Sequence, residues 1–214
     1  MNDTATAAKT RPRHDPRATG GRLHGKTVAI LATDGYERSE LRDPKEALEA
    51  EGAIAEVISP KSGAIKAWKH GDWADEIHVD HTLAEADPAR YDALVLPGGT
   101  INADHLRANA SAVEFVKAFF ERHKPVGAIC HAPWLLVEAD VCKSRRLTSW
   151  PSLKTDVRNA GGDWVDEEVV RDDQLVTSRK PDDLPAFNAS LVELVANDSV
   201  EPRVKVKVAA PDVS

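Results

Sequence analysis

Short apolar runs alternate along the chain with longer segments in which apolar residues recur at helical spacing. The run Thr27–Thr33 is continuously apolar and rich in β-favouring residues, as in a strand that is buried on both faces. From Ser39 to Glu51 apolar and small positions recur with the period of a helix, and Gly52 ends the pattern. The same order continues with strands over 55–59, 93–96 and 126–129 and a helix over 111–123. Strands that alternate with helices indicate an α/β fold with a doubly wound, mostly parallel sheet sandwiched by helices.

The second half of the chain continues this alternation and closes it with a hairpin. Its pattern predicts helices over 134–139, 153–160 and 181–196, and strands over 147–149, 164–170 and 175–178. The polar turn Arg171–Gln174 separates the last two strands, which is a hairpin signal. The segment Lys61–Asp80 holds two glycines, two tryptophans and several charges, and we interpret it as a short hairpin or loop excursion.

The two ends of the chain lack this periodicity. Residues 1–24 are polar, with arginines among Pro, Gly and Thr, and predict a disordered N-terminal arm. We expect a single domain over residues 25–197 and a C-terminal tail over 198–214.

Charge and composition narrow the classes of partner. A net charge of -7, without a concentrated basic face, argues against nucleic acid as a partner. No stretch approaches the roughly 20 apolar residues that span a bilayer, and the N-terminus lacks the apolar core of a secretory signal, so we expect no membrane association and a cytoplasmic protein. Only Cys130 and Cys142 are present, too few for a disulfide framework, so a reduced thiol is available for chemistry.

Cys130 stands where an apolar strand meets the start of a helix. Such an elbow exposes the side chain at its apex, and the first N–H groups of the helix favour an anion there. Cysteines so placed can have a pKa between roughly 3.5 and 7.5, which makes Cys130 a candidate thiolate nucleophile. The alternative is a small buried hydrophobe, since free cysteine is among the most buried residue types. His131 favours the chemical interpretation, provided that the backbone at Cys130 is not helical, because a neighbouring imidazole can move the thiol proton.

Two further segments reach the same edge of the predicted sheet. Glu37 and Glu40 follow the first strand, and Gly98 and Gly99 follow the strand over 93–96. Ligands bind at the carboxyl ends of strands in such sheets, so these residues could form one pocket with Cys130. The Gly-Gly turn would offer free N–H groups to an oxyanion. The alternatives are solvated carboxylates at a helix start and an ordinary turn.

The sequence predicts neither a metal site nor a cofactor. His70, His78 and His81 lie close together in the sequence but without paired cysteines or His-Glu-x-x-His spacing, and we expect them on the surface. A Walker loop and a dinucleotide-binding glycine motif are both absent.

Taken together, these signals resemble the ThiJ/PfpI superfamily, and most closely its PfpI branch of cysteine peptidase-like and general stress proteins. The resemblance runs from about Lys26 to Ala196 and rests on segments 32–44, 93–99, 128–133, 148–151, 159–164 and 177–179. It implies a flavodoxin-like domain, also described as class I glutamine amidotransferase-like.

The resemblance also implies roles for individual residues. Cys130 would be the nucleophile with His131 beside it, Glu40 would hydrogen-bond the sulfur, and Glu37 would line the pocket. In peptidase members an acid after the Gly-Gly turn reaches the catalytic histidine of a neighbouring subunit, and the nearest match here is Asp104. Trp150 occupies a position where peptidase-like members often carry Tyr, and Cys142 matches no functional position.

The implied function is a cysteine-dependent stress-response hydrolase or lyase that needs no cofactor. Its substrates would be reactive carbonyls such as methylglyoxal, or glycation adducts, as in a deglycase or glyoxalase. The alternatives are an intracellular cysteine peptidase and a non-catalytic redox sensor or holdase that acts through oxidation of Cys130. The resemblance further implies a homodimer or higher homo-oligomer.

Overall fold

The central layer is a seven-stranded sheet in the order β11-β12-β8-β7-β1-β3-β6. Its strands are β1 (Thr27–Leu31), β3 (Ile54–Ser59), β6 (His81–Thr82), β7 (Ala93–Leu96), β8 (Val126–Ile129), β11 (Val169–Asp172) and β12 (Leu175–Ser178). All neighbours in this sheet are parallel except the hairpin of β11 and β12. The predicted α/β class with a mostly parallel sheet is confirmed.

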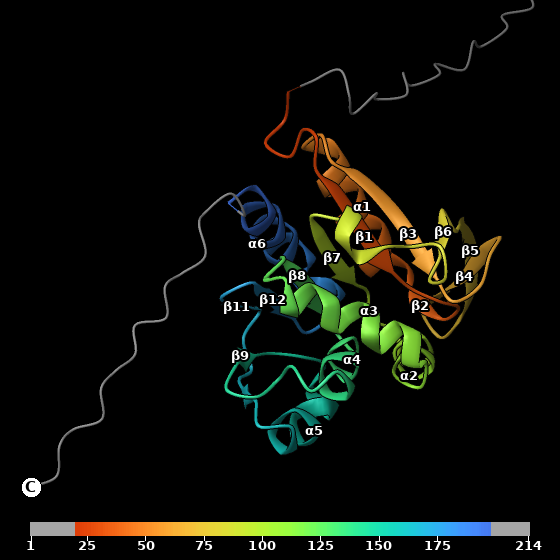
Figure 1. The fold of residues 1–214 in the computed structure, drawn as a ribbon. Coiled ribbons are helices and arrows are strands. Elements are labelled where there is room, and N and C mark those ends of the chain that lie inside the picture. The colour runs from red at the N-terminus through yellow and green to blue at the C-terminus, as the bar shows by residue number, and fades with distance from the viewer. Residues whose placement is uncertain (1–19, 198–214) are drawn as a thin grey trace, which may run out of the picture.

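Helices cover both faces of the sheet (Figure 1). One face carries α1 (Arg38–Ala50) and α6 (Leu184–Ala196), and the other carries α2 (Thr100–Arg107), α3 (Ala110–Glu121) and α4 (Pro133–Glu138). Alternate residues of a strand point to opposite faces, so Val28 and Ile30 belong to the first core, whereas Ala29 and Leu31 belong to the second. Strands buried on both faces explain why the sequence has continuous apolar runs there.

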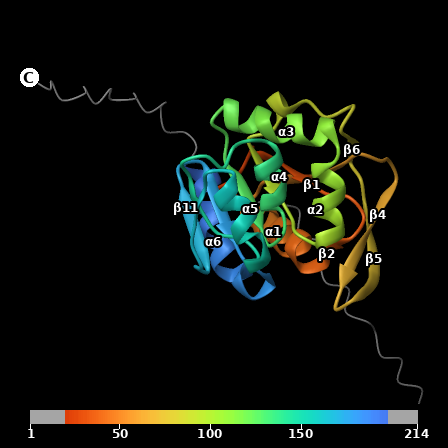
Figure 2. The ribbon, with the colours of Figure 1, turned by 90° about the horizontal axis from the view of Figure 1, so that it is seen from below.

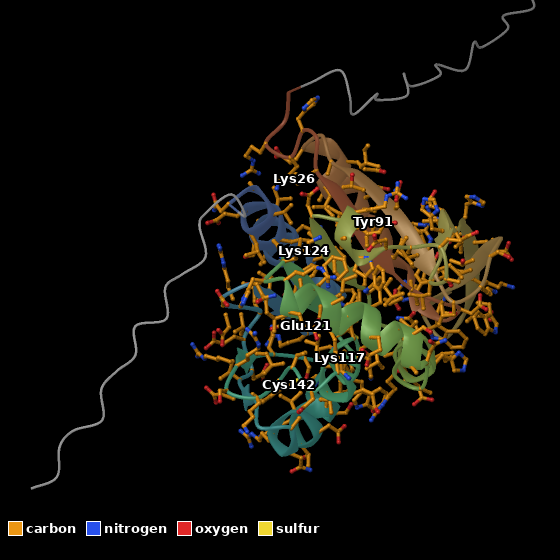
Figure 3. All side chains as sticks on the ribbon, in the orientation of Figure 1. Lys26, Tyr91, Lys117, Glu121, Lys124 and Cys142 are labelled. Carbon is orange, nitrogen blue, oxygen red and sulfur yellow. The ribbon has the colours of Figure 1, made fainter. Side chains whose placement is uncertain are left out.

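The helix α3 illustrates how the layers are held together. Asn109 caps it by accepting a hydrogen bond from the Ala112 N–H at 3.1 Å. Phe115, Val116 and Phe119 are buried against the sheet, and each such side chain stabilises the fold by about 1.5–3 kcal/mol. The chain then turns at Lys124, whose Nζ donates to the carbonyls of Pro88 at 2.9 Å and Ala89 at 3.1 Å. Figure 3 shows Lys124 near Tyr91, so this lysine ties the end of α3 to the start of β7.

The segment Lys61–Asp80 forms the hairpin that its turn residues indicate. Strands β4 (Ala64–Lys69) and β5 (Asp72–His78) are antiparallel, and β4 also pairs with the short β2 (Tyr36–Glu37). This second sheet stands at one side of the molecule, beyond α2 (Figure 2). By pairing with β2, it braces the loop that carries Glu37.

Four elements differ from the sequence-based expectation. The strand expected over 164–170 is two separate strands, β10 (Asp163–Trp164) and β11, with no strand over 165–168. The helix α2 was not predicted, because its eight residues are too few to establish a helical period. The strand expected over 147–149 is β9 (Arg146–Leu147), which pairs with β10 (Asp163–Trp164) outside the central sheet. The helix expected over 153–160 begins with a 3₁₀ turn, Pro151–Leu153, and continues as α5 (Lys154–Asn159). Two more 3₁₀ turns, Pro88–Arg90 and Pro181–Asp183, precede β7 and α6.

The computed structural model describes residues 20–197, and the tail predicted over 198–214 lies outside them. Most of the predicted N-terminal arm, residues 1–19, also lies outside. Its last residues are part of the fold, since Leu23 is fully buried and its N–H donates to the Glu51 carbonyl at 2.8 Å. A single apolar residue carries no periodicity, which is why the pattern placed the boundary after it.

Candidate active site

Cys130 sits at the apex of a strained turn between β8 and α4. Its φ is 62°, in the left-handed region that costs a non-glycine residue of order 1–3 kcal/mol. Two backbone hydrogen bonds hold it there, from its N–H to the Ser178 carbonyl at 3.0 Å and from the Trp150 N–H to its own carbonyl at 2.7 Å. The helix α4 begins only at Pro133, so the backbone at Cys130 is not helical. Neighbouring side chains can therefore face each other, and Cys130 Sγ lies 3.2 Å from His131 Nδ1.

Cys130 combines burial with polar neighbours. It is 6% exposed and contacts the core between the sheet and α1 and α6. The Glu40 carboxyl and the backbone N–H groups of Gly99 and His131 also lie against its sulfur. If Cys130 were an inert buried thiol, its low exposure would be explained, but the polar groups around its sulfur would not.

Glu40 is buried in the first turn of α1. It has no exposed surface, and its Oε2 accepts a hydrogen bond from the Gly98 N–H at 2.9 Å. Its carboxyl also reaches the Cys130 thiol. The alternative of a solvated carboxylate at a helix start is therefore wrong for Glu40. Glu37 is half-buried on β2, where its Oε1 accepts a hydrogen bond from the Ser39 hydroxyl at 3.4 Å.

Burial sets the protonation of this group of residues. It raises the pKa of Glu40 to about 8, and the nearby charge of Glu37 acts in the same direction. Burial also raises the pKa of Cys130, as does a negative charge on Glu40, whereas the N–H groups of Gly99 and His131 lower it. Burial lowers the pKa of His131. At neutral pH Glu40 therefore keeps its proton and His131 is a neutral base. The expected low pKa of Cys130 is wrong for the resting protein, because burial raises its pKa by more than the Gly99 and His131 N–H groups lower it.

The Gly98–Gly99 turn allows three segments to meet at this point. A Cβ atom on Gly98 would lie 2.4 Å from Glu40 Oε2 and 2.6 Å from Cys130 Cβ, closer than any real contact. Gly99 has φ 91°, and a Cβ there would lie 2.3 Å from the Gly35 carbonyl oxygen. Both glycines are thus required by close approach, and the turn is more than a chain reversal.

Asn102 holds this turn in place, although it was not among the predicted site residues. Its side chain is fully buried, and its Oδ1 accepts a hydrogen bond from the Thr33 N–H at 2.8 Å. Its Nδ2 donates to the Pro97 carbonyl at 2.9 Å and to the Gly98 carbonyl at 3.0 Å. The one available signal is a polar residue three positions after a glycine pair, which is weak by itself.

The imidazole of His131 is held by aromatic rings and by a hydroxyl. It stacks on Trp150, with centroids 5.6 Å apart and an interplanar angle of 22°, and meets Trp134 edge-on at 5.6 Å. Its Nε2 lies 3.3 Å from Thr100 Oγ1. Trp150 is 38% exposed beside the His131 ring, and its role in a substrate pocket stays a prediction. Thr100 and Trp134 are the contacts that sequence reasoning missed.

Asp104 and Cys142 lie apart from this group. Asp104 is exposed on α2, and its carboxylate forms no hydrogen bond or ion pair within residues 20–197, so a single chain does not bring it to His131. Its predicted contact with a neighbouring subunit stays a prediction. Cys142 is fully buried near α5 (Figure 3), and burial raises its pKa to about 12.

The described part of the chain contains no group of three His, Cys, Asp or Glu side chains that could hold a metal ion. It also contains no helix long and apolar enough to cross a membrane.

The chain is similar to known proteins in both sequence and fold. Residues 26–194 match the DJ-1/PfpI family. Protein/nucleic acid deglycase 2 of Escherichia coli strain K12 is 43% identical over 171 residues, which cover 79% of this chain and 98% of that protein. General stress protein 18 of Bacillus subtilis strain 168 is 42% identical over 172 residues, 80% of this chain and 98% of that protein. A solved two-domain protein of Anabaena variabilis, with DJ-1/ThiJ/PfpI-like and ferritin-like domains, superposes with a TM-score of 0.76 at 33% identity; the match covers 86% of this chain and 52% of that one.

Proposed function

Since the chain belongs to the DJ-1/PfpI family, we propose that it is a stress-response deglycase that removes carbonyl adducts from amines through Cys130. The observation that carries this proposal is the contact of 3.2 Å between Cys130 Sγ and His131 Nδ1. A thiol within hydrogen-bond reach of a neutral imidazole is the arrangement that nucleophilic catalysis requires.

The first step uses His131 as the base. His131 Nδ1 takes the thiol proton while the sulfur attacks the carbon that bears the amine in a glycation adduct. The C–S bond forms and the C–N bond breaks, and the protonated His131 gives its proton to the leaving amine. The carbonyl fragment stays on Cys130 as a hemithioacetal, isomerises to a thioester, and leaves as a 2-hydroxy acid when water cleaves the C–S bond. Free thiol and amine are thereby restored.

Glu40 stabilises the sulfur while its charge changes. Because the pKa of Glu40 is raised to about 8, its carboxyl is neutral at pH 7 and can donate a hydrogen bond to the Cys130 sulfur beside it. Hydrogen bonds to an ionised acceptor are roughly twice as strong as those between neutral groups, so this bond strengthens as the thiolate forms. The amides of Gly99 and His131 act in the same direction. The site therefore favours the thiolate during attack rather than at rest.

The test is release of amine from a methylglyoxal adduct of N-acetyl-lysine, followed together with formation of 2-hydroxy acid. We expect Cys130→Ser to lower turnover by at least about 100-fold, because a hydroxyl is a far poorer nucleophile near pH 7. Cys142→Ser is the matched control and should keep full turnover, since Cys142 is buried away from the site. Full turnover by Cys130→Ser would reject catalysis by this thiol.

Peptide hydrolysis is less well supported. The acid that the resemblance assigns to peptidase members is Asp104, and one chain leaves it exposed without a contact to His131. Hydrolysis of a fluorogenic peptide, assayed beside the adduct, measures this alternative. Light scattering measures homo-oligomerisation, which would bring Asp104 of a second copy near the site.

A further inference from the structure

We propose that Thr100 is the positioning residue that orients His131 for proton transfer from Cys130, so that one chain contains a complete Cys–His–Thr arrangement. The inference deepens the proposed function, on which it rests, because it concerns how the same thiol is activated. It assigns within one subunit a role that the resemblance gives to Asp104 of a neighbouring subunit.

The two ring nitrogens of His131 have different partners. Nδ1 lies 3.2 Å from Cys130 Sγ, and Nε2 lies 3.3 Å from Thr100 Oγ1. A neutral imidazole carries one N–H, so Nδ1 can accept the thiol proton only when the hydrogen is on Nε2. In that tautomer the Nε2–H donates to Thr100 Oγ1, so both edges of the ring are hydrogen-bonded at the same time. Because a hydroxyl can accept or donate, Thr100 positions the ring in either tautomer and does not select one.

Thr100 is held in place by the elements on either side of it. It is the first residue of α2 and directly follows Gly99, which forms the N-terminal cap. Two residues later, the buried Asn102 fixes the turn through its bonds to the Pro97 and Gly98 carbonyls. The Thr100 hydroxyl is therefore attached to a rigid backbone, although Thr100 itself is exposed.

The two tryptophans restrict the ring of His131. Trp150 stacks on one face at 22° and Trp134 contacts the ring at 63°, so the plane of the imidazole is determined by packing. A contact at each edge then holds Nδ1 toward the sulfur and Nε2 toward Thr100. Packing determines the plane of the ring, and the Thr100 contact determines its orientation within that plane.

A hydroxyl in this position differs chemically from a carboxylate. When Nδ1 takes the thiol proton, the imidazolium still donates its Nε2–H to Thr100, and no charge is created on the threonine. A carboxylate would raise the pKa of the imidazole, whereas burial lowers the pKa of His131 and Thr100 does not oppose this. The protonated ring is therefore a strong acid, suited to returning its proton to the leaving amine.

The experiment compares three variants in the full-length Cys142→Ser protein. Thr100→Val keeps the shape of the side chain and removes the hydroxyl, Thr100→Ser restores it, and Asp104→Asn tests the competing acid. The first readout is the rate of Cys130 alkylation by iodoacetamide against pH, which needs no substrate and remains valid even if the protein is not a deglycase. The second is the ¹⁵N chemical shift of the His131 ring nitrogens, which reports the tautomer directly.

We expect Thr100→Val to lower alkylation at pH 7 by at least about tenfold, as for misorientation of a general base, and to change the ¹⁵N shift of Nε2, which loses its hydrogen-bond partner. On the adduct substrate kcat should fall while KM is unchanged. Thr100→Ser and Asp104→Asn should resemble the parent protein in both readouts. A parental alkylation profile and parental ¹⁵N shifts in Thr100→Val, or a change in Asp104→Asn instead, would overturn the proposal.

Discussion

Glu40 is a carboxyl group that the fold keeps out of water. In the unfolded chain it ionises above its ordinary pKa of 4.5, whereas the folded protein retains its proton up to about 8. Folding therefore takes up a proton between these values, and the free energy of unfolding falls as the pH rises through this window. The contribution of Glu40 to stability is complete below about pH 4.5 and is lost progressively up to about pH 8.

Replacing Glu40 by Gln should remove this pH dependence. The amide oxygen still accepts from the Gly98 N–H, and its NH₂ can still donate to Cys130. We expect the stability of Glu40→Gln relative to wild type to increase by roughly 1.4 kcal/mol per pH unit between about 5 and 8. Urea denaturation at several pH values measures it. Glu121→Gln, at the exposed end of α3 in Figure 3, is the control, and equal slopes in Glu40→Gln and wild type would contradict a buried neutral carboxyl.

Gly98 has no room for a side chain. Gly98→Ala would place a methyl group against both Glu40 Oε2 and Cys130 Cβ, and the turn must shift to accommodate it. We expect destabilisation by about 1–3 kcal/mol, as for overpacked cores, together with loss of at least about 99% of turnover as the sulfur loses its donors. Thermal melting and the adduct assay measure the two effects. Gly20→Ala, where a Cβ meets nothing within 4 Å, should change neither.

At the scale of elements, the junction of β7 with α2 fixes the positions of several residues of the site. The first turn of α2 contains both Thr100 and Asn102, and the side chain of Asn102 connects it to the end of β1 through the Thr33 N–H. The strained turn at Cys130 is likewise held by bonds to β12 and to the segment before the 3₁₀ turn at Pro151. The site is therefore built where elements end, and bonds between different elements fix it.

Asn102→Ala should loosen this junction. It leaves the Thr33 N–H and the Pro97 carbonyl without their partner, whereas the Gly98 carbonyl keeps its bond from the Glu37 N–H. Each buried unpaired group costs about 1–3 kcal/mol. We expect at least about 2 kcal/mol of destabilisation by urea denaturation, with slower alkylation of Cys130. Asn159→Ala, an exposed amide in α5, is the control. Equal stability of the two variants would show that the bonds of Asn102 do not hold the turn.

For the whole molecule, the hydrogen bonds of the site within residues 20–197 join residues between Thr33 and Ser178. The family match covers residues 26–194. The Escherichia coli relative is matched over 98% of its own length by 79% of this chain. The residues of the described site thus all lie within the part that the family match covers.

A protein reduced to residues 20–197 should therefore keep its melting temperature and its turnover of the adduct. Leu23 must remain, since it is buried against the end of α1 and its removal would leave a cavity. A second truncation starting at Gly25 should melt at a lower temperature. Loss of turnover by the 20–197 protein with an unchanged melting temperature would show that the ends contribute to catalysis.

The sequence by itself determined most strands and helices, and it indicated Cys130 as the candidate nucleophile. Strands such as Val126–Ile129 are buried on both faces, so their apolar character is local and visible in the chain, and Cys130 follows directly from where that strand ends. Glu40, Gly98 and Gly99 were placed near it because strand ends meet at one edge of a parallel sheet. These inferences need only periodicity and topology.

Only the tertiary structure decided the protonation and orientation of the site. That Glu40 is neutral depends on complete burial, and that His131 meets Thr100, Trp134 and Trp150 depends on three segments far apart in sequence. The same holds for Asn102, whose three bonds reach two other segments, and for Asp104, which faces solvent although the sequence sets it beside the same turn. Desolvation and hydrogen-bond direction depend on residues that other segments bring into contact. The local sequence around a residue therefore does not predict them.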